Sequence, residues 1–222
     1  MIFADNITVQ VSEGRDAITL LRDQTVLFPS MARVGVLAPP GSGRTTLSRV
    51  FGGITRPSSG HMLIEGTVGW PIGYSGFFNP LLSLAENIEH IATLKRASPS
   101  ELASVISWMC GSDSLFDMTF GTLPPSDRAT AVYAASLAVH NDHIIADEKI
   151  VLSDAAVAEK SNLLLSKRLE GAGLLFFSRN ARLLGNWCET FYVLIDKQLH
   201  AVPDPAAGQA MLDRVQLAES AT

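Results

Sequence analysis

A glycine-rich segment near residue 40 has the residue types and the spacing that bind phosphate groups. It reads Ala38-Pro39-Pro40-Gly41-Ser42-Gly43-Arg44-Thr45. A short buried strand is expected at residues 32–37 before it, and apolar residues with helical spacing occupy 45–51 after it. In such a strand–loop–helix unit, backbone N–H groups and the positive end of the helix surround phosphates, and a hydroxyl binds Mg²⁺. The segment therefore predicts a phosphate-binding loop.

Three positions of this loop depart from the G-x-x-x-x-G-K-[ST] pattern, although Gly43 and Thr45 match it. Ala38 stands at the first glycine. Pro40 removes one N–H group that could bind a phosphate oxygen. Arg44 replaces the lysine and keeps its charge, but its planar fork is bulkier than a point-like ammonium. An ordinary turn between a strand and a helix remains the alternative explanation of the loop taken alone.

The composition limits the class of protein. Hydrophobic residues make up 47% of the 222 residues and charged residues 18%, which indicates either a parallel sheet buried on both faces or an apolar surface covered by a partner. A net charge of −5 without a basic run argues against nucleic-acid binding. No stretch approaches the roughly 20 apolar residues of a membrane span, and residues 1–6 do not resemble a signal peptide, so we expect a cytoplasmic chain. Cys110 and Cys188 have no nearby His or Cys, which favours buried free thiols over a metal site or a disulfide.

Alternating patterns and turn residues predict an α/β fold with a mainly parallel sheet and helices on both faces. Residues 7–11 and 17–21 alternate as antiparallel strands, joined by a turn around Glu13, Gly14 and Arg15. Ser83 and Ser98 are candidate N-caps within a helical region over 84–120. The remaining expected elements are a helix over 128–139, a strand over 143–146 that ends on Asp147-Glu148, a helix over 155–170, and strands over 174–177 and 191–195.

Several segments after the loop resemble the ATP-binding subunits of ABC exporters of capsular polysaccharide. Residues 51–60, FGGITRPSSG, resemble the G-G-I-x-R-P-x-S-G stretch of that family. Residues 68–79, VGWPIGYSGFFN, resemble its S-W-P-x-G-x-S-G-G-F-Q segment, and residues 84–88, LAENI, resemble the T-x-R-E-N-V that follows. Phe116-Asp117-Met118 lies the usual short distance before the family's signature position. The resemblance spans about residues 4–213 almost without gaps.

The resemblance implies one ABC-type nucleotide-binding domain over residues 1–222. It implies an antiparallel β part at about 1–30, a core of P-loop NTPase type over 31–78 and 140–200, a helical subdomain at about 80–139, and a C-terminal tail over 201–222.

The resemblance also assigns roles to individual residues. Asp147 would hold Mg²⁺ through water together with Thr45, and Glu148 would polarise the attacking water. A surface Asp-Glu pair at a strand end is the alternative. Arg179 stands where the family has its switch histidine. The positions that would contact ATP are Gly41, Ser42, Gly43, Arg44, Thr45, Thr46, Asn79, Ser126 and Asp154.

Four catalytic positions are altered together. Besides Arg44, Asn79 replaces the Q-loop glutamine, and Pro124-Pro125-Ser126-Asp127-Arg128 replaces the signature S-S-G-M-R. Two prolines remove N–H donors, and Asp127 places a negative charge where a polyphosphate would lie. Arg179 cannot accept a hydrogen bond as histidine can. Val11 also stands at the place of the aromatic residue that stacks on adenine. We expect weak ATP binding and a site that has lost efficient turnover.

The expected role is that of an ATP-binding subunit on the cytoplasmic face of the inner membrane. Its partners would be a polytopic membrane permease and a second ATP-binding subunit, in a homodimer or a heterodimer. An apolar groove around Asn79 to Asn87, with Phe77, Phe78, Leu81 and Leu82, would receive the permease. The alternative is an inactive scaffold or regulator, alone or paired with a competent homologue. A small-molecule kinase is disfavoured because no basic lid segment is present.

Overall fold

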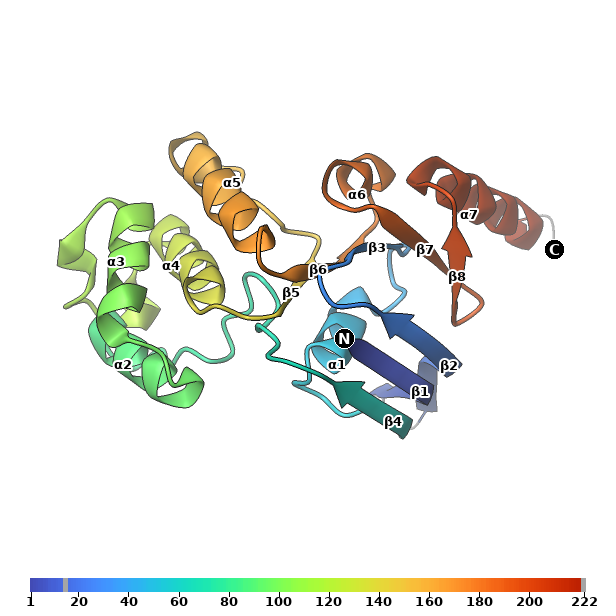
Figure 1. The fold of residues 1–222 in the computed structure, drawn as a ribbon, viewed down its shortest axis with the longest axis horizontal. Helices are drawn as coiled ribbons and strands as arrows, with labels where there is room; N and C mark the ends of the chain where they lie inside the picture. Colours follow the sequence, from blue (N-terminus) through green and yellow to red (C-terminus); the bar gives the residue numbers. More distant parts are fainter. Residues whose placement is uncertain (14–15, 221–222) are drawn as a thin grey trace. The chain divides into compact units, whose positions relative to one another are not determined.

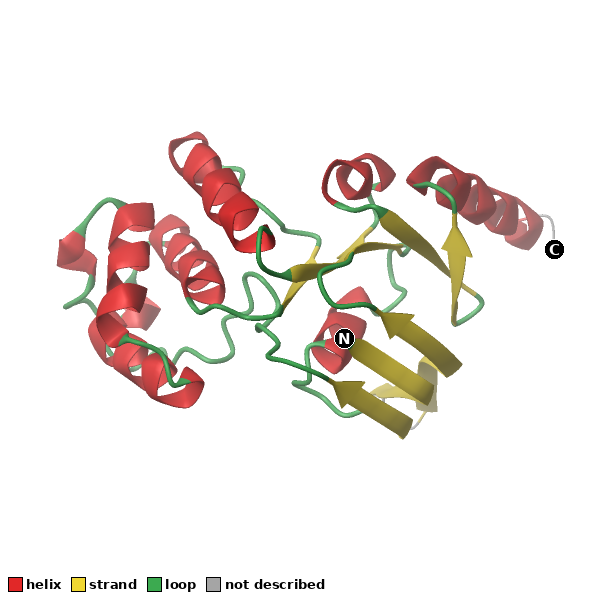
Figure 2. Ribbon diagram, viewed as in Figure 1, coloured by secondary structure: helices red, strands yellow, loops and turns green. Residues whose placement is uncertain are grey.

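The computed structural model describes residues 1–13 and 16–220, so Gly14 and Arg15 of the expected turn lie outside the described residues. The chain divides into two compact units (Figure 1). The sheet unit consists of Met1–Trp70, Asn141–Glu148 and Gly171–Thr222, and the helical unit consists of Pro71–His140 and Lys149–Glu170. All of the strands that the structure describes belong to the sheet unit (Figure 2). No described helix combines the length and the apolar character that crossing a bilayer requires.

The sheet unit begins with a three-stranded antiparallel sheet in the order β2-β1-β4. Its strands are β1 (Ile2–Glu13), β2 (Asp16–Phe28) and β4 (Ser59–Ile64). Alternation along β1 buries Ile2, Ala4, Ile7 and Val9, which confirms the antiparallel strands expected here. The register shifts along β1, so the strands are longer and more irregular than the sequence pattern indicated.

The second sheet of this unit has the order β5-β6-β3-β7-β8. Four strands are parallel: β3 (Arg33–Leu37), β5 (His143–Asp147), β6 (Gly173–Ser178) and β7 (Thr190–Ile195). Every residue of β6 is buried, as expected for a parallel strand covered on both faces. Helix α1 (Arg44–Phe51) lies between the two sheets, because Phe51 contacts both Phe28 of β2 and Phe177 of β6.

The end of the chain is more ordered than the expected tail over 201–222. Strand β8 (Gln198–Val202) pairs with β7 as a hairpin, and helix α7 (Pro205–Ser220) packs beside α6 (Ala181–Trp187) and the sheet. Asp196 and Lys197 both have positive φ at the hairpin turn, of 49° and 64°. Such turns are usually marked by Asn-Gly, and the absence of a glycine here concealed the hairpin.

The helical unit contains α2 (Leu84–Lys95), α3 (Pro99–Cys110), α4 (Pro125–Ala138) and α5 (Ala155–Leu169). Ser83 and Ser98 cap α2 and α3, as predicted. The single helical region expected over 84–120 is wrong beyond residue 110. Gly111 ends α3 in a left-handed conformation, and only the short 3₁₀ turns η1 (Asp113–Leu115) and η2 (Phe120–Thr122) follow.

Candidate functional site

The glycine-rich loop joins β3 to α1 and has the backbone conformation of a cradle. Gly41 and Gly43 have φ of 78° and 80°, which side-chain-bearing residues rarely adopt. A Cβ atom on Gly43 would lie 2.4 Å from Leu20 Cδ1, whereas one on Gly41 would meet nothing within 4 Å. Helix α1 has no acidic residue in its first turn, so the unpaired N–H groups of that turn, where Thr45 and Thr46 lie, keep their positive potential.

Thr45 and Asp147 come together at the edge of this loop. Thr45 Oγ1 donates a hydrogen bond of 2.5 Å to Asp147 Oδ2, which joins α1 to the end of β5. Hydroxyl and carboxylate oxygens are the ligands that Mg²⁺ prefers. The two residues predicted for the metal therefore lie within reach of a single ion.

Arg44 turns back toward its own loop. Its Nη1 donates hydrogen bonds to the carbonyl oxygens of Ala38, at 2.6 Å, and Pro39, at 2.9 Å. Its Nε lies 3.0 Å from Glu148 Oε1, and the Arg44 side chain is only 16% exposed. The cation is therefore bound by the residues that precede the cradle and by the carboxylate of Glu148.

Glu148 holds its carboxylate beside Arg44 through an unusual backbone conformation. Its φ is +59°, and its N–H donates to Phe177 O at 2.9 Å. The carboxylate accepts a hydrogen bond of 2.9 Å from the backbone N–H of Arg179. Ser178 Oγ lies 3.5 Å from the other carboxylate oxygen. Arg179, predicted as the replacement of the switch histidine, contributes its backbone to this contact.

Two polar atoms of the loop fit a polyphosphate. Ser42 Oγ and Arg44 Nε are buried, and neither has a hydrogen-bond partner among the described residues. Leaving buried donors unsatisfied costs free energy, so such atoms indicate a missing ligand oxygen. Together with the cradle and the Thr45–Asp147 pair, they suit a phosphate chain with a divalent cation.

Three other predicted site residues, Asn79, Asp154 and Ser126, belong to the helical unit. Asn79 Oδ1 accepts a hydrogen bond from Leu81 N at 3.0 Å, which is a local turn contact. Asp154 caps α5 through Ala156 N, at 2.9 Å. Ser126 lies exposed in the first turn of α4, which begins at Pro125 with Pro124 as its N-cap. The helix predicted to start at residue 128 starts earlier because proline fits these first positions.

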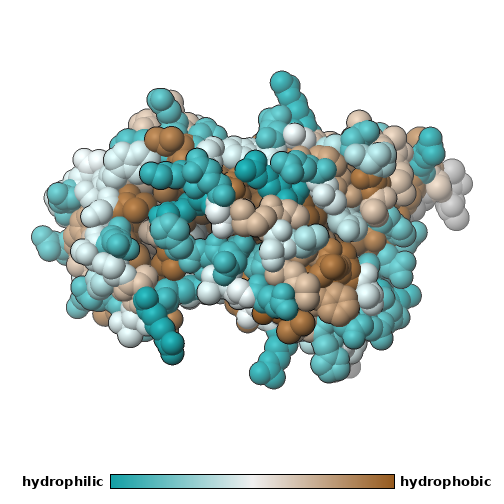
Figure 3. All heavy atoms as spheres, in the orientation of Figure 1, coloured by the Kyte–Doolittle hydropathy of each residue, from teal (hydrophilic) through white to brown (hydrophobic). Residues whose placement is uncertain are grey.

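The expected permease groove needs one correction. Phe78 is only 6% exposed and stacks on Phe120 with ring centroids 4.4 Å apart, so it belongs to the core of the helical unit. Leu81, in contrast, is 84% exposed. Leu94 and Leu163 of the same unit are also exposed, and Figure 3 shows hydrophobic residues among the polar ones on one face. Apolar surface is therefore available in the helical unit, but Phe78 is not part of it.

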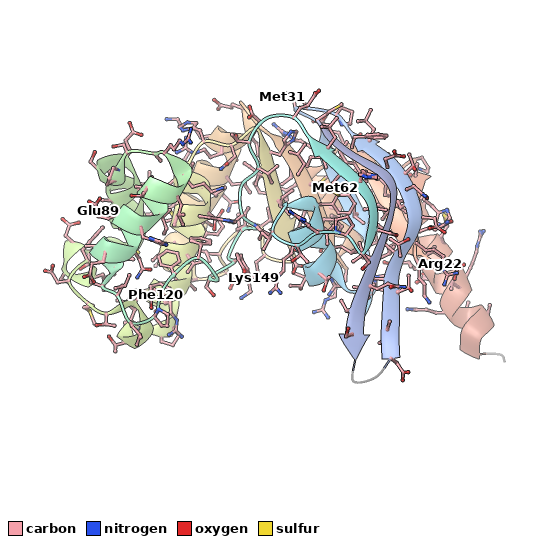
Figure 4. All side chains as sticks on the ribbon, turned by 90° about the horizontal axis from the view of Figure 1, so that it is seen from below. Arg22, Met31, Met62, Glu89, Phe120 and Lys149 are labelled. Carbon is pink, nitrogen blue, oxygen red and sulfur yellow. The ribbon has the colours of Figure 1, made fainter. Side chains whose placement is uncertain are left out.

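A cavity of about 310 Å³ in the helical unit was not foreseen from the sequence. Phe120 and Lys149, both labelled in Figure 4, line it together with Arg128 and Tyr133. Its walls come from three segments far apart in the chain, so no local pattern could indicate it. The pairing of Arg44 with Glu148 was missed for the same reason.

Comparison with known proteins supports the exporter resemblance. No protein-family model matches the chain. It is 27% identical over 191 residues to a polysialic acid transport ATP-binding protein, KpsT, of Escherichia coli, covering 85% of this chain and 87% of the relative. It is 22% identical over 204 residues to the ATP-binding protein BexA of Haemophilus influenzae, covering 92% and 94% of the two chains.

Solved structures show the same fold. The dimeric structure of MJ0796, a bacterial ABC transporter cassette, matches with a TM-score of 0.72 at 21% identity, covering 90% of this chain and 97% of that one. The structure of an ATP-binding subunit of an ABC transporter matches with a TM-score of 0.76 at 15% identity, covering 98% of both. The predicted fold class, with its mainly parallel sheet, antiparallel β subdomain and helical subdomain, is confirmed. The chain has the fold of an ABC transporter cassette, and its sequence is related to those of the ATP-binding proteins of capsular-polysaccharide export.

Proposed function

We propose that this chain is the ATP-binding subunit of an ABC exporter of capsular or other surface polysaccharide. The chain aligns with polysaccharide-export ATP-binding proteins over most of both lengths. As such a subunit it dimerises, binds a polytopic permease, and works on the cytoplasmic face of the inner membrane.

The contact between Thr45 and Asp147 carries the nucleotide part of this proposal. Two side-chain oxygens of the kinds that Mg²⁺ prefers lie 2.5 Å apart, beside a loop whose Ser42 Oγ and Arg44 Nε are buried without hydrogen-bond partners among the described residues. Thr45 and Asp147 would hold Mg²⁺, which when bound supplies positive charge that neutralises phosphate oxygens. The N–H groups of the first turn of α1 would hold the phosphates themselves.

We further propose that hydrolysis is weak. Arg44 is bound to two loop carbonyls, and Glu148 is paired with it, so neither is placed for its role in turnover. Pro124 and Pro125 remove donors at the start of α4, and Asp127 adds a negative charge in its first turn. The residues that remain can bind and orient a polyphosphate, but they lack a free base.

Calorimetric titration with Mg-ATP tests the proposal. We expect a dissociation constant in the high-micromolar range, which is about −5 kcal/mol. Asp147→Asn should abolish the difference between ATP affinity with Mg²⁺ and with a chelator. Asp196→Asn is the matched control, since Asp196 lies exposed at the β7–β8 turn and asparagine tolerates its positive φ. Absence of ATP binding at millimolar concentration would refute the proposal. A sub-micromolar dissociation constant would show that ATP binding is not weak.

The second candidate function is an inactive scaffold or regulator that pairs with a competent homologue. The Arg44–Glu148 pair favours it, because it engages two catalytic positions with each other. The two candidates differ in a steady-state ATPase assay of the wild type and Glu148→Gln. A rate that the substitution abolishes supports an energising subunit. A background rate that it leaves unchanged supports the scaffold.

A further inference from the structure

We propose that a polyphosphate enters this site by exchange, displacing the carboxylate of Glu148 from Arg44. Glu148 is then a positioning residue that holds the place of a phosphate, and it sets nucleotide affinity. This inference rests on the proposed nucleotide-binding function and describes how that binding is regulated.

The contacts of Arg44 show which nitrogen of its guanidinium is available to bind an anion. Nη1 is held by Ala38 O and Pro39 O, so one edge of the guanidinium is fixed to the loop backbone. Nε lies 3.0 Å from Glu148 Oε1 but forms no hydrogen bond with any described residue, since the approach is poorly aligned. The two side chains are close enough to attract each other, while the Nε–H group of Arg44 remains without a hydrogen bond. A better aligned phosphate oxygen would satisfy that donor.

The contacts of Glu148 show that the carboxylate is held in place from its own side. The Arg179 N–H binds Oε1, the same oxygen that faces Arg44. The left-handed backbone at Glu148, with φ of +59°, and the hydrogen bond from its N–H to Phe177 O set the direction of its Cα–Cβ bond, while the side-chain torsions stay free to rotate. Glu148 is 32% exposed, so the carboxylate can swing toward solvent once Arg44 is engaged elsewhere.

Charge makes the exchange necessary. Asp147 and Glu148 are consecutive carboxylates at the end of β5, next to a loop that offers Arg44 as its cation. A polyphosphate beside Glu148 in its present position would lie next to a like charge. Removing the charge of Glu148 should therefore strengthen binding, because it removes both the competitor for Arg44 and the repulsion.

The test is a titration of ADP without Mg²⁺, so that binding is measured without hydrolysis and without the contribution of a metal ion. We expect Glu148→Gln to lower the dissociation constant about tenfold, which corresponds to about 1.4 kcal/mol. The control Glu189→Gln makes the same change of net charge at an exposed position and should shift the dissociation constant less than twofold. In an Arg44→Gln background, Glu148→Gln should strengthen binding less than it does in the wild type, because only the like-charge repulsion is then removed. Glu148→Asp keeps the charge on a shorter side chain and should increase the affinity for ADP less than Glu148→Gln does. It replaces Glu148→Gln in the test if that variant does not fold.

Two outcomes overturn the exchange in different ways. If the wild type binds ADP and neither Glu148 variant binds it more tightly, the nucleotide site stands and the exchange is wrong. If no variant binds ADP at all, the proposed function fails and the exchange fails with it. Urea unfolding without nucleotide gives a second readout. The midpoint shifts of Arg44→Gln and Glu148→Gln should be non-additive in the double variant, and additive shifts would show that the pair is not coupled.

Discussion

The phenolic hydroxyl of Tyr133 in α4 lies 3.0 Å from the carbonyl oxygens of both Ile150 and Ser161. The single hydroxyl proton is therefore shared between the segment before α5 and α5 itself. Tyr133 is 2% exposed, and burial raises the pKa of its hydroxyl well above the usual value near 10, although the Ser161 side chain opposes this shift.

Tyr133→Phe should lower the free energy of unfolding by about 1–2 kcal/mol, because two buried carbonyls lose a donor. The neutral phenol is the stable form in the folded state, so its contribution is complete below about pH 10 and is lost as the pH rises toward the raised pKa. Urea unfolding at pH 7.5 and pH 10.5 measures both effects. We expect a steeper alkaline loss of stability in the wild type than in Tyr133→Phe. Equal losses would contradict the burial argument. Tyr74→Phe provides a control at a less buried tyrosine.

The two loop glycines should respond differently to alanine. Both have positive φ, so each substitution costs about 1–2 kcal/mol of backbone strain. Only at Gly43 would the new Cβ overlap Leu20, at 2.4 Å, and we expect a total loss of about 3 kcal/mol there. Thermal unfolding of Gly43→Ala and Gly41→Ala makes the comparison. Adding Leu20→Val should recover part of the loss in Gly43→Ala and none in Gly41→Ala. Equal losses at the two glycines would show that φ alone governs the loop.

Leu81 and Phe78 should separate permease docking from folding. Leu81→Asp changes a side chain that is 84% exposed, so the fold should persist while co-purification with a membrane subunit is lost. Phe78→Asp buries a charge beside Phe120 and should cost more than about 4 kcal/mol. Circular dichroism monitors the fold and affinity capture monitors the partner. Normal capture of Leu81→Asp would remove Leu81 from the docking surface.

Restoring the catalytic motifs should need several changes together. Arg44→Lys and Arg179→His alone should recover little ATPase activity, because the start of α4 still lacks donors. Further changes should be required before turnover rises: Pro124→Ser, Pro125→Ser, Ser126→Gly and Asp127→Met. Steady-state phosphate release measures each step. High turnover of the wild type, abolished by Glu148→Gln, would contradict the weak hydrolysis that we propose.

The amino-acid sequence by itself determined the strands of the parallel sheet, the helix after the loop and their order along the chain. Alternation in β1, the continuous apolar run of β6, and the caps at Ser83 and Ser98 are local signals, because each depends on residues within a few positions of one another. The glycine-rich loop between β3 and α1 and the carboxylates at the end of β5 could likewise be read along the chain. They identified the candidate phosphate and metal residues Gly43, Thr45 and Asp147.

Only the tertiary structure decided how those residues are used. The pairing of Arg44 with Glu148 joins positions 104 apart in the sequence, and a positive φ at Glu148 directs the carboxylate. The burial of Phe78 against Phe120 and the glycine-free turn between β7 and β8 were also decided there. Local patterns report which residues favour a helix, a strand or a turn. Which distant side chains meet depends on the packing of whole elements, and that packing turned the cation of the loop toward its own backbone and Glu148.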